Sequence, residues 1–260
     1  MTLKKFQKTI REYYKNHKRD FPWRHTKNPY KILVSEVMLQ QTQAPRVVPR
    51  YNSFLKKFPT AKALANANLS DVLQEWQGLG YNRRALYLKQ AAEKVQNRFP
   101  KDFKTLTSLP GIGPCTAADI MIFAWNIPMV AIETNIRSVF IHFFFKNREK
   151  VHDKEILPLV EKTLDKKNPR EWVWALFDYG TFLKERENPS RKSLHHAKQT
   201  KFIGSHRQKR SKILKLILEK PRTEKEILTQ TKFEKETVSK ILSDLQKEGL
   251  IKKTRNKFFV

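Results

Sequence analysis

The segment Leu109–Ile120, LPGIGPCTAADI, constrains the fold more than any other part of the chain. Pro110 cannot continue a preceding helix, and Gly111 and Gly113 accept backbone angles that other residues resist. The helix that begins directly after the turn presents free N–H groups, and the missing side chains let a phosphate approach them closely. The segment therefore predicts two helices joined by a phosphate-binding turn, although a GxG turn alone also suits an ordinary helix connection.

The charge balance favours a polyanionic partner. Lys and Arg number 53 against 25 Asp and Glu, which gives a formal net charge of +28 and a sequence pI near 10.2. Such an excess is typical of nucleic-acid-binding proteins. Association with ribosomes, binding to an anionic membrane or a generic basic surface are less specific explanations of this charge. The longest apolar run, near residues 140–145, is far shorter than the roughly 20 residues of a membrane-spanning helix.

Two further features concern the compartment and metals. The N-terminal residues MTLKKFQKTIREYYKNHKRDFPW have no apolar signal core, so we expect an intracellular, cytoplasmic protein. Cys115 is the only cysteine, which argues against a disulfide framework and an all-cysteine metal site. We therefore expect no bound metal.

Composition divides the chain into three regions. Residues 1–186 contain apolar-periodic stretches of helical length, separated by Pro and Gly, without strand-like alternation, so we predict an all-helical domain. Ser70 is the expected N-cap of its third helix. Residues 187–206 form a polar, basic connector typical of a flexible linker. The expected helices of the first region are Pro29–Gln41, Pro45–Phe58, Leu69–Gln77, Arg83–Arg98, Cys115–Trp125, Asn135–Phe145, Lys154–Leu164 and Glu171–Lys184.

The third region, residues 207–260, predicts a small α/β domain. A first helix stops at Pro221, and Thr223 opens a capping box for a short second helix that ends near Thr229. A third helix and two short strands follow. They span Lys235–Glu248, Leu250–Ile251 and Lys257–Val260.

Three helices and a β-wing resemble a winged helix, whose third helix often enters the major groove of DNA. Domains of this kind also bind proteins. From Lys184 onward the chain has 22 Lys and Arg but only 9 Asp and Glu, which favours DNA.

From Phe21 to about Pro189 the chain resembles the adenine glycosylases of the MutY family, within the helix–hairpin–helix glycosylase superfamily. SEVMLQQTQ distinguishes the MutY branch from the endonuclease III branch. The resemblance implies a mostly α, two-lobed helical glycosylase domain, here followed by the winged-helix-like domain. The matching blocks are FPWR at Phe21–Arg24, PYKILVSEVMLQQTQ at Pro29–Gln43, LANANLSDVLQEWQGLGYNRRA at Leu64–Ala85, the hairpin, and ETNIRSVF at Glu133–Phe140.

The resemblance implies base excision repair, in which a mispaired adenine opposite 8-oxoguanine or guanine is flipped out and its glycosidic bond is hydrolysed. Glu36 matches the family's acid, and burial in its apolar segment would raise its pKa. Glu133-Thr134-Asn135 stands where the family has Asp-Gly-Asn. Glu133 would stabilise the cationic sugar, or simply cap the next helix, with its carboxylate moved by about an ångström. Asn135 is expected to hydrogen-bond near the sugar or the carboxylates.

Further roles follow from the same match. Cys115 occupies the position of the Schiff-base lysine of bifunctional members, so the expected product is an abasic site in an uncut strand. Gln41 and Tyr81 match the residues that wedge into the duplex. Arg83 and Arg84 are additional candidates for phosphate contacts. The expected DNA-binding residues are Arg24, Gln41, Tyr81, Gly111, Gly113 and Cys115.

The chain also departs from the family. The first three of the four cysteines that hold an iron–sulfur cluster fall near Lys184, Arg191 and Leu194, so we expect no cluster. The domain that recognises 8-oxoguanine is not apparent. The expected partner is double-stranded DNA with a mismatch or lesion, bound by a monomer. Two alternatives remain: excision of hypoxanthine, or of uracil or thymine opposite guanine, and a non-catalytic DNA-binding protein that retains the fold.

Overall fold

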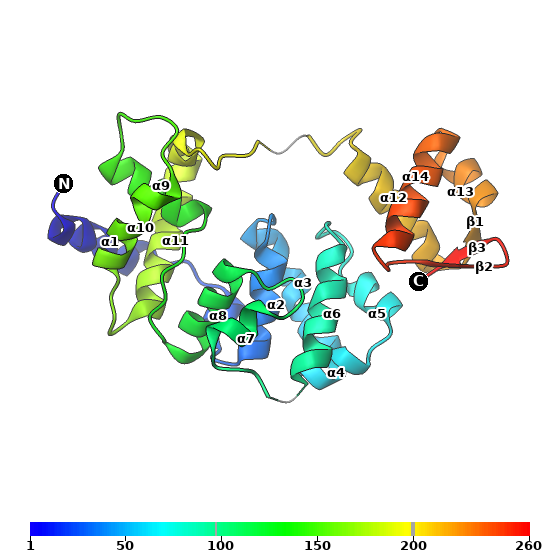
Figure 1. Cartoon of the computed structure of the whole chain (residues 1–260), viewed down its shortest axis with the longest axis horizontal. Helices are drawn as coiled ribbons and strands as arrows, with labels where there is room; N and C mark the ends of the chain where they lie inside the picture. The colour runs from blue at the N-terminus through cyan, green and yellow to red at the C-terminus, as the bar shows by residue number, and fades with distance from the viewer. Residues whose placement is uncertain (97, 199–200) are drawn as a thin grey trace. The chain divides into compact units, whose positions relative to one another are not determined.

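The computed structural model describes residues 1–96, 98–198 and 201–260. The described residues are mostly helical (Figure 1), and none of their helices is long and apolar enough to cross a membrane. The elements are α1 (Leu3–His17), η1 (Pro22–His25), α2 (Pro29–Leu39), α3 (Ala44–Lys57), α4 (Ala61–Asn66), α5 (Leu69–Glu75), α6 (Arg83–Val95), α7 (Phe103–Thr107), α8 (Pro114–Trp125), α9 (Thr134–Phe144), α10 (Asp153–Thr163), α11 (Pro169–Arg186), η2 (Pro189–Lys192), α12 (His206–Glu219), β1 (Arg222–Thr223), α13 (Glu224–Thr231), α14 (Lys235–Lys247), β2 (Lys252–Thr254) and β3 (Lys257–Phe259).

All eight helices predicted for the first region are present, and the mostly α fold class is confirmed. The expected N-cap at Ser70 is wrong. Asn68 has an extended backbone (φ −68°, ψ 144°), and its carbonyl accepts the first helical hydrogen bond from the Val72 N–H at 3.2 Å. Ser70 therefore lies inside the first turn of α5.

Contacts divide the chain into two compact units, each built from three segments. The first contains the described residues of 1–36, 100–108 and 112–198. The second contains those of 37–99, 109–111 and 199–260. The chain thus passes between units several times, and neither unit corresponds to one continuous stretch of sequence.

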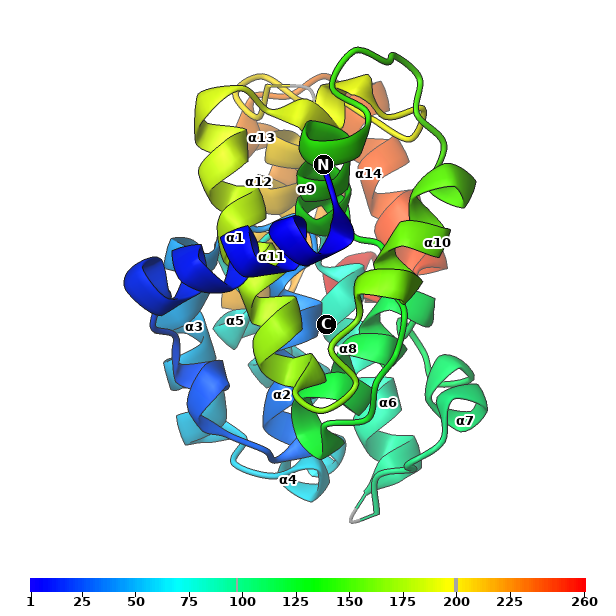
Figure 2. The ribbon, with the colours of Figure 1, turned by 90° about the vertical axis from the view of Figure 1, so that its left-hand side faces the viewer.

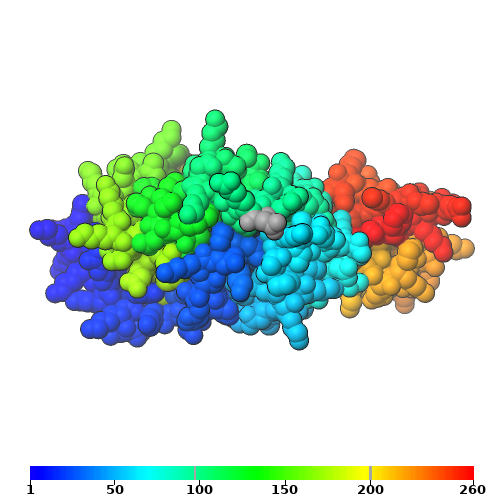
Figure 3. Space-filling model, turned by 90° about the horizontal axis from the view of Figure 1, so that it is seen from below, coloured from blue at the N-terminus to red at the C-terminus, as the bar shows by residue number. Residues whose placement is uncertain are grey.

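The core of the first unit is aromatic. Phe6 of α1 is fully buried, and its ring lies 5.1 to 5.2 Å from three phenylalanine rings of α9 and 6.0 Å from Trp172 of α11. Figure 2 shows α1 lying across α11, and Figure 3 shows dark-blue N-terminal residues beside yellow-green ones. Burial of such a side chain contributes about 1.5–3 kcal/mol. The amino-terminal helix therefore holds α9 and α11 together.

Gly180 allows α11 to pack directly on the start of α9. A Cβ atom at this position would lie 2.5 Å from the carbonyl oxygen of Asn135 and 2.6 Å from its Cβ. Close-packed interiors do not tolerate such distances, so a side chain would push the two helices apart. The missing side chain thus sets the position of Asn135 and of its neighbour Glu133.

The first part of the predicted connector is packed rather than free. Pro189 and Ser190 are buried, and the Val151 N–H donates to the Lys192 carbonyl at 2.9 Å. The Leu194 N–H donates back to the Val151 carbonyl at 3.0 Å. These contacts join residues more than 40 positions apart, so local composition did not reveal them. Residues 199–200 of the connector lie outside the described residues.

The C-terminal region forms the predicted three helices and wing. The capping box is confirmed, because the Glu226 N–H donates to Thr223 Oγ1 at 3.2 Å and the Thr223 N–H donates to Glu226 Oε2 at 2.6 Å. Its antiparallel sheet has the order β1-β3-β2, and β1 was not predicted. The expected strand at Leu250–Ile251 is wrong. Both residues are buried in the core, and β2 begins one residue later.

Candidate active site

Glu36 lies on α2 in an apolar environment. The side chain of Asn28 accepts hydrogen bonds from the first free N–H groups and so starts this helix. Burial is the main cause that raises the pKa of Glu36 to about 8, and the charge of Glu133 raises it further, whereas Arg24 lowers it. The carboxyl therefore holds a proton at neutral pH, as an acid that protonates a leaving group must. Its buried neighbours on α2 are Ile32, Leu33, Val34, Val37 and Met38.

Glu133 is the N-cap of α9. Its Oε1 accepts from the backbone N–H groups of Asn135 at 2.6 Å and Ile136 at 2.8 Å, and its Oε2 accepts from Asn135 Nδ2 at 3.2 Å. Burial raises the pKa of Glu133, but these donors favour its charged form. The helix cap considered from sequence is therefore present. Burial thus raises the pKa of both Glu36 and Glu133, but hydrogen-bond donors partly offset this effect at Glu133.

A third carboxyl, Asp119, belongs to the same cluster and was not singled out from sequence. It is 7% exposed. Burial raises its pKa well above the ordinary value, and the charges of Glu36 and Glu133 raise it further. Asp119 is the only charged residue of α8, which is the same signal, an isolated acid in an apolar helix, that identified Glu36.

Cys115 lies one helical turn before Asp119. Its Sγ donates to the Ile132 carbonyl at 3.6 Å, directly before Glu133 in the chain. Burial raises the pKa of the Cys115 thiol, and the charges of Asp119 and Glu133 raise it further. The thiolate is therefore disfavoured, which fits a residue lining the site better than a nucleophile.

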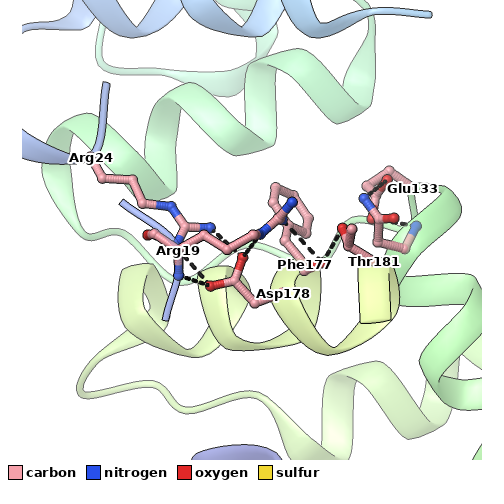
Figure 4. A network of polar contacts seen from close by, with 7 residues as sticks. Arg19, Arg24, Glu133, Phe177, Asp178 and Thr181 are labelled. Atoms are coloured by element: carbon pink, nitrogen blue, oxygen red, sulfur yellow. Dashed lines mark hydrogen bonds and ion pairs between the residues drawn. The ribbon is translucent and has the colours of Figure 1, made fainter. Parts of the chain in front are cut away.

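Arg24 is held in a buried ion pair with Asp178 of α11. Its Nη2 lies 2.7 Å from Asp178 Oδ1 and its Nη1 lies 2.8 Å from Oδ2, while Arg19 Nε donates to Oδ1 at 2.6 Å. Figure 4 shows both guanidinium groups directed at Asp178, with Glu133, the N-cap of α9, drawn beyond Thr181 of α11. The Arg24 side chain is only 7% exposed, and the ion pair with Asp178 compensates its buried charge. A contact between Arg24 and DNA stays a prediction.

In the second unit, the two expected wedge residues share an unusual backbone conformation. Gln41 has φ 56° and Tyr81 has φ 47°. Residues other than glycine rarely adopt this left-handed backbone conformation, because it costs conformational energy. It persists where the surrounding structure imposes it, often at functional sites. Both residues line one cleft together with Arg83, Tyr87 and Gly111. The structure thus brings the predicted wedge residues together.

Arg84 of α6 positions these two loops. Its guanidinium donates to the carbonyls of Val37 at 2.8 Å and Gly80 at 3.1 Å, and also to that of Gln40. Burial lowers the pKa of Arg84 to about 10. Arg84 was a candidate phosphate contact, but its side chain is buried and donates its hydrogen bonds to backbone carbonyl groups. It instead ties the segment before Gln41 to the segment before Tyr81.

The two hairpin glycines have different surroundings. Gly111 has φ 73°, and a Cβ atom there would lie 2.8 Å from Tyr87 Cβ. Gly113 is the extended N-cap of α8, and a Cβ atom there would meet nothing within 4 Å. Gly111 therefore serves the fold, whereas Gly113 leaves open space beside free helical N–H groups.

A matched pair of substitutions separates these roles. Gly111→Ala is expected to destabilise the protein by about 1–3 kcal/mol, because the new side chain meets both strain and a clash. Gly113→Ala is expected to change stability by less than about 0.5 kcal/mol and to weaken duplex binding roughly tenfold by obstructing a phosphate. Thermal unfolding and fluorescence anisotropy with a labelled duplex measure the two effects. Equal losses of stability in both variants would contradict the assignment.

The residues present do not fit the iron–sulfur cluster that the family resemblance implies. Such clusters need thiolate ligands, and Cys115 is the only cysteine of the chain. In the part of the chain that the structure describes, no group of three or more His, Cys, Asp or Glu side chains could hold a metal ion. Backbone hydrogen bonds between Val151 and residues 192–194 fasten this segment instead.

The described residues form a mostly helical protein with the buried carboxyls Glu36, Asp119 and Glu133 and with a glycine-containing turn before α8. Residues 34–164 match the family described as "HhH-GPD superfamily base excision DNA repair protein". The chain belongs to this family. Residues 207–253 match the family described as "Bacterial regulatory protein, arsR family", in agreement with the winged-helix-like domain.

Relatives of two kinds are similar to this chain. The adenine DNA glycosylase of Buchnera aphidicola subsp. Baizongia pistaciae (strain Bp) is 35% identical over 198 residues, which are 73% of this chain and 56% of the relative. The thymine/uracil-DNA glycosylase of Methanothermobacter thermautotrophicus is 29% identical over 69% of this chain and 85% of the relative. A solved thermostable thymine-DNA glycosylase has a TM-score of 0.64 and 28% identity, covering 72% of this chain and 90% of that one. The chain spans about half the length of the adenine glycosylases it matches.

Proposed function

We propose that the protein is a monofunctional DNA glycosylase that removes a mispaired adenine opposite 8-oxoguanine or guanine. The observation that carries the proposal is the pair of buried carboxyls Glu36 and Glu133, which differ in their hydrogen-bond donors. Burial keeps Glu36 protonated, while three N–H donors stabilise the charge of Glu133. Excision of a purine needs one group of each kind.

The reaction follows from these two groups. Once the adenine is flipped out, Glu36 donates its proton to the base as the glycosidic bond breaks and the bonding electrons leave with the base. The Glu133 carboxylate stabilises the positive charge that develops on the sugar. Water adds its hydroxyl to the sugar carbon, and the proton it releases restores a carboxyl of the site. The products are free adenine and an abasic site.

Strand cleavage is not part of the proposed activity. Bifunctional glycosylases use an amine that forms a Schiff base with the sugar, and Cys115 stands at that position. The raised pKa of the Cys115 thiol further disfavours nucleophilic attack. The strand should therefore stay intact until it is treated with alkali.

Double-stranded DNA with a lesion is the proposed partner. The net charge of +28 favours a polyanion. The strained Gln41 and Tyr81 share one cleft, as side chains that enter a duplex beside the flipped base would. The wing adds the exposed cations Lys252, Lys253, Arg255 and Lys257. We further propose that the protein binds as a monomer and without an iron–sulfur cluster.

A second candidate is excision of thymine or uracil opposite guanine. One observation favours it specifically: the match covers 85% of the thymine/uracil relative but 56% of the adenine relative from Buchnera. Glu133 also departs from the aspartate expected of adenine glycosylases. The motif SEVMLQQTQ at residues 35–43 favours adenine.

Duplex cleavage assays test these possibilities. The protein is incubated with duplexes that carry A opposite 8-oxoguanine, A opposite G, hypoxanthine opposite T, and T or U opposite G, each followed by alkali. We expect alkali-dependent cleavage at adenine. Cleavage only at a pyrimidine would establish the second candidate, and cleavage of none of the duplexes, with binding retained, would indicate a non-catalytic protein. Cleavage without alkali would refute the role inferred from Cys115.

A further inference from the structure

We propose that Arg207 of α12 is a positioning residue for Tyr81, and that the winged-helix-like domain acts through this contact on the insertion of Tyr81 into a duplex. Arg207 holds the Tyr81 ring in its projecting orientation before DNA binds, so less conformational freedom is lost when the ring enters the base stack. The inference rests on the role of Tyr81 as a wedge in the proposed function. It does not depend on which base is excised.

The contact joins two residues that are 126 positions apart in the chain. Arg207 Nη1 donates to the Tyr81 hydroxyl at 3.2 Å. The guanidinium carbon of Arg207 also lies 5.8 Å from the centre of the Tyr81 ring, a distance at which a cation is attracted to an aromatic face. Arg207 therefore contacts both the ring and its hydroxyl group, which restrains the direction of the ring as well as its position.

A second arginine, Arg84, contacts the same ring. Its guanidinium carbon lies 5.6 Å from the ring centre, and its Nη2 donates to the carbonyls of Leu79 and Gly80, both at 3.1 Å. Arg84 is thus fixed to the loop that precedes Tyr81. Tyr81 nevertheless stays 43% exposed. The ring therefore projects into solvent while two cations restrain its orientation, which is the state that a wedge needs before it meets a duplex.

The helix that carries Arg207 is itself held in place. Arg210, one turn later on α12, forms a bidentate ion pair with Glu248 at the end of α14, with distances of 3.1 and 2.6 Å. Both partners line the same cleft as the wedge residues. A Cβ atom at Gly249 would lie 3.8 Å from Leu86 Cδ2, so the end of α14 packs on α6, and α12 contacts α5. Arg207 is therefore presented by a helix that is anchored beside the wedge cleft.

The expected benefit is a lower entropic cost of insertion. Ordering one side chain on binding costs a factor of about two to ten in affinity. Arg207 restrains the Tyr81 ring in the free protein, so much of this cost is removed before the duplex arrives. Loss of the contact should therefore weaken insertion of the ring. It should have little effect on a complex in which no side chain enters the base stack.

Insertion is measured in the full-length protein with two mismatched duplexes, adenine opposite 8-oxoguanine and thymine opposite guanine. Each carries 2-aminopurine beside the mismatch, whose fluorescence rises when the base loses its stacking. A 2′-fluoro group on the target nucleotide destabilises the developing sugar cation and so prevents excision. With Arg207→Gln, half of the fluorescence rise should need a roughly three- to tenfold higher protein concentration.

Lys215→Gln is the matched control. It removes the same charge from an exposed position about two turns further along α12. We expect it to change the fluorescence titration by less than about twofold. The affinity of Arg207→Gln for a fully paired duplex should change no more than that of the control. An equal loss on paired and mismatched duplexes would mean that Arg207 is an ordinary phosphate contact, and would overturn the proposal.

The Tyr81→Leu background decides whether Arg207 acts through Tyr81. Leucine lacks the ring and the hydroxyl, so adding Arg207→Gln should change the titration by less than about twofold. An undiminished effect in this background would mean that Arg207 acts on the DNA directly, and the proposal would fall. It would fall equally if Arg207→Gln alone left insertion unchanged or made it easier, because the contact would then be idle or a restraint.

A measurement without DNA tests the contact itself. Protein labelled with 3-fluorotyrosine carries seven labelled side chains, and the fluorine NMR signal that is missing in Tyr81→Leu belongs to Tyr81. Arg207→Gln should shift this signal, whereas Lys215→Gln should leave it in place. A signal that Arg207→Gln does not move would show that the two side chains are not in contact.

The outcomes distinguish the possible failures. If wild type raises the fluorescence but excises no base from the unmodified duplexes, the proposed function fails and the role of Arg207 stands. If wild type excises adenine but Arg207→Gln inserts normally, the proposed function stands and the role of Arg207 fails. If wild type raises the fluorescence of neither duplex, Tyr81 is not a wedge and Arg207 has no insertion to assist.

Discussion

Glu36→Gln is expected to lower the single-turnover rate of base excision by a factor of about 10²–10⁴. Glutamine has the size and hydrogen-bonding shape of the protonated acid, but its amide does not give up a proton to a leaving base. The surroundings on α2 are apolar, and the pKa of Glu36 is raised to about 8, so the neutral side chain resembles the native state. The loss should therefore be confined to the chemical step.

Three controls accompany this substitution. The melting temperature of Glu36→Gln should not fall, because no charged contact is removed at neutral pH. Its affinity for the duplex should stay within a few-fold of wild type. Glu12→Gln, at a side chain on α1 that is 62% exposed, should excise at the wild-type rate. A Glu36→Gln variant that retains more than about a tenth of the wild-type rate would exclude Glu36 as the acid.

Asp178→Asn is expected to cost about 3–5 kcal/mol of unfolding free energy. Asp178 is 2% exposed and pairs with both Arg19 and Arg24. In the native protein the Asp178 carboxylate neutralises the charge of the nearly buried Arg24 guanidinium. The asparagine amide has no negative charge, so the variant leaves that guanidinium charge without a counter-charge. Chemical denaturation, with the midpoint and slope fitted together, measures the change.

Asp165→Asn is the matched control for this ion pair. Asp165 also pairs with an N-terminal arginine, Arg11, whose side chain is 56% exposed. Solvent screens this contact, and the asparagine oxygen still accepts from the Lys167 and Asn168 N–H groups. The expected cost is below about 1 kcal/mol. Similar costs for both variants would show that burial of the Asp178 cluster is not what makes it important.

Helix positions and the burial of Glu36 could be predicted because their signals are local. The 3.6-residue period, the prolines and glycines, and the Thr223 capping box each act within one or two turns of chain. The buried carboxyl of Glu36 could be recognised from its apolar neighbours in sequence, and that of Asp119 could have been recognised by the same signal. The predicted N-cap at Ser70 and the predicted strand at Leu250–Ile251 were wrong, because the start of a helix or of a strand also depends on how the chain packs.

The roles of the arginines needed the folded chain. Arg24 and Arg84 look like phosphate contacts in a basic sequence, but one is buried against Asp178 and the other against backbone carbonyls. Asp178 lies 154 residues from Arg24. No periodicity links positions so far apart, and a buried cation can be told from a solvated one only by its surroundings.

The amino-acid sequence by itself determined that the chain forms helices joined by a glycine-containing turn at residues 110–113, and that one acidic residue lies in an apolar segment. These properties depend on backbone geometry and on neighbours a few residues away. The tertiary structure decided that three carboxyls from α2, α8 and the start of α9 are buried, and that of the three only Glu133 accepts hydrogen bonds from other described residues. Burial and the direction of hydrogen-bond donors set the proton affinity of each group, and both exist only once distant helices have packed together.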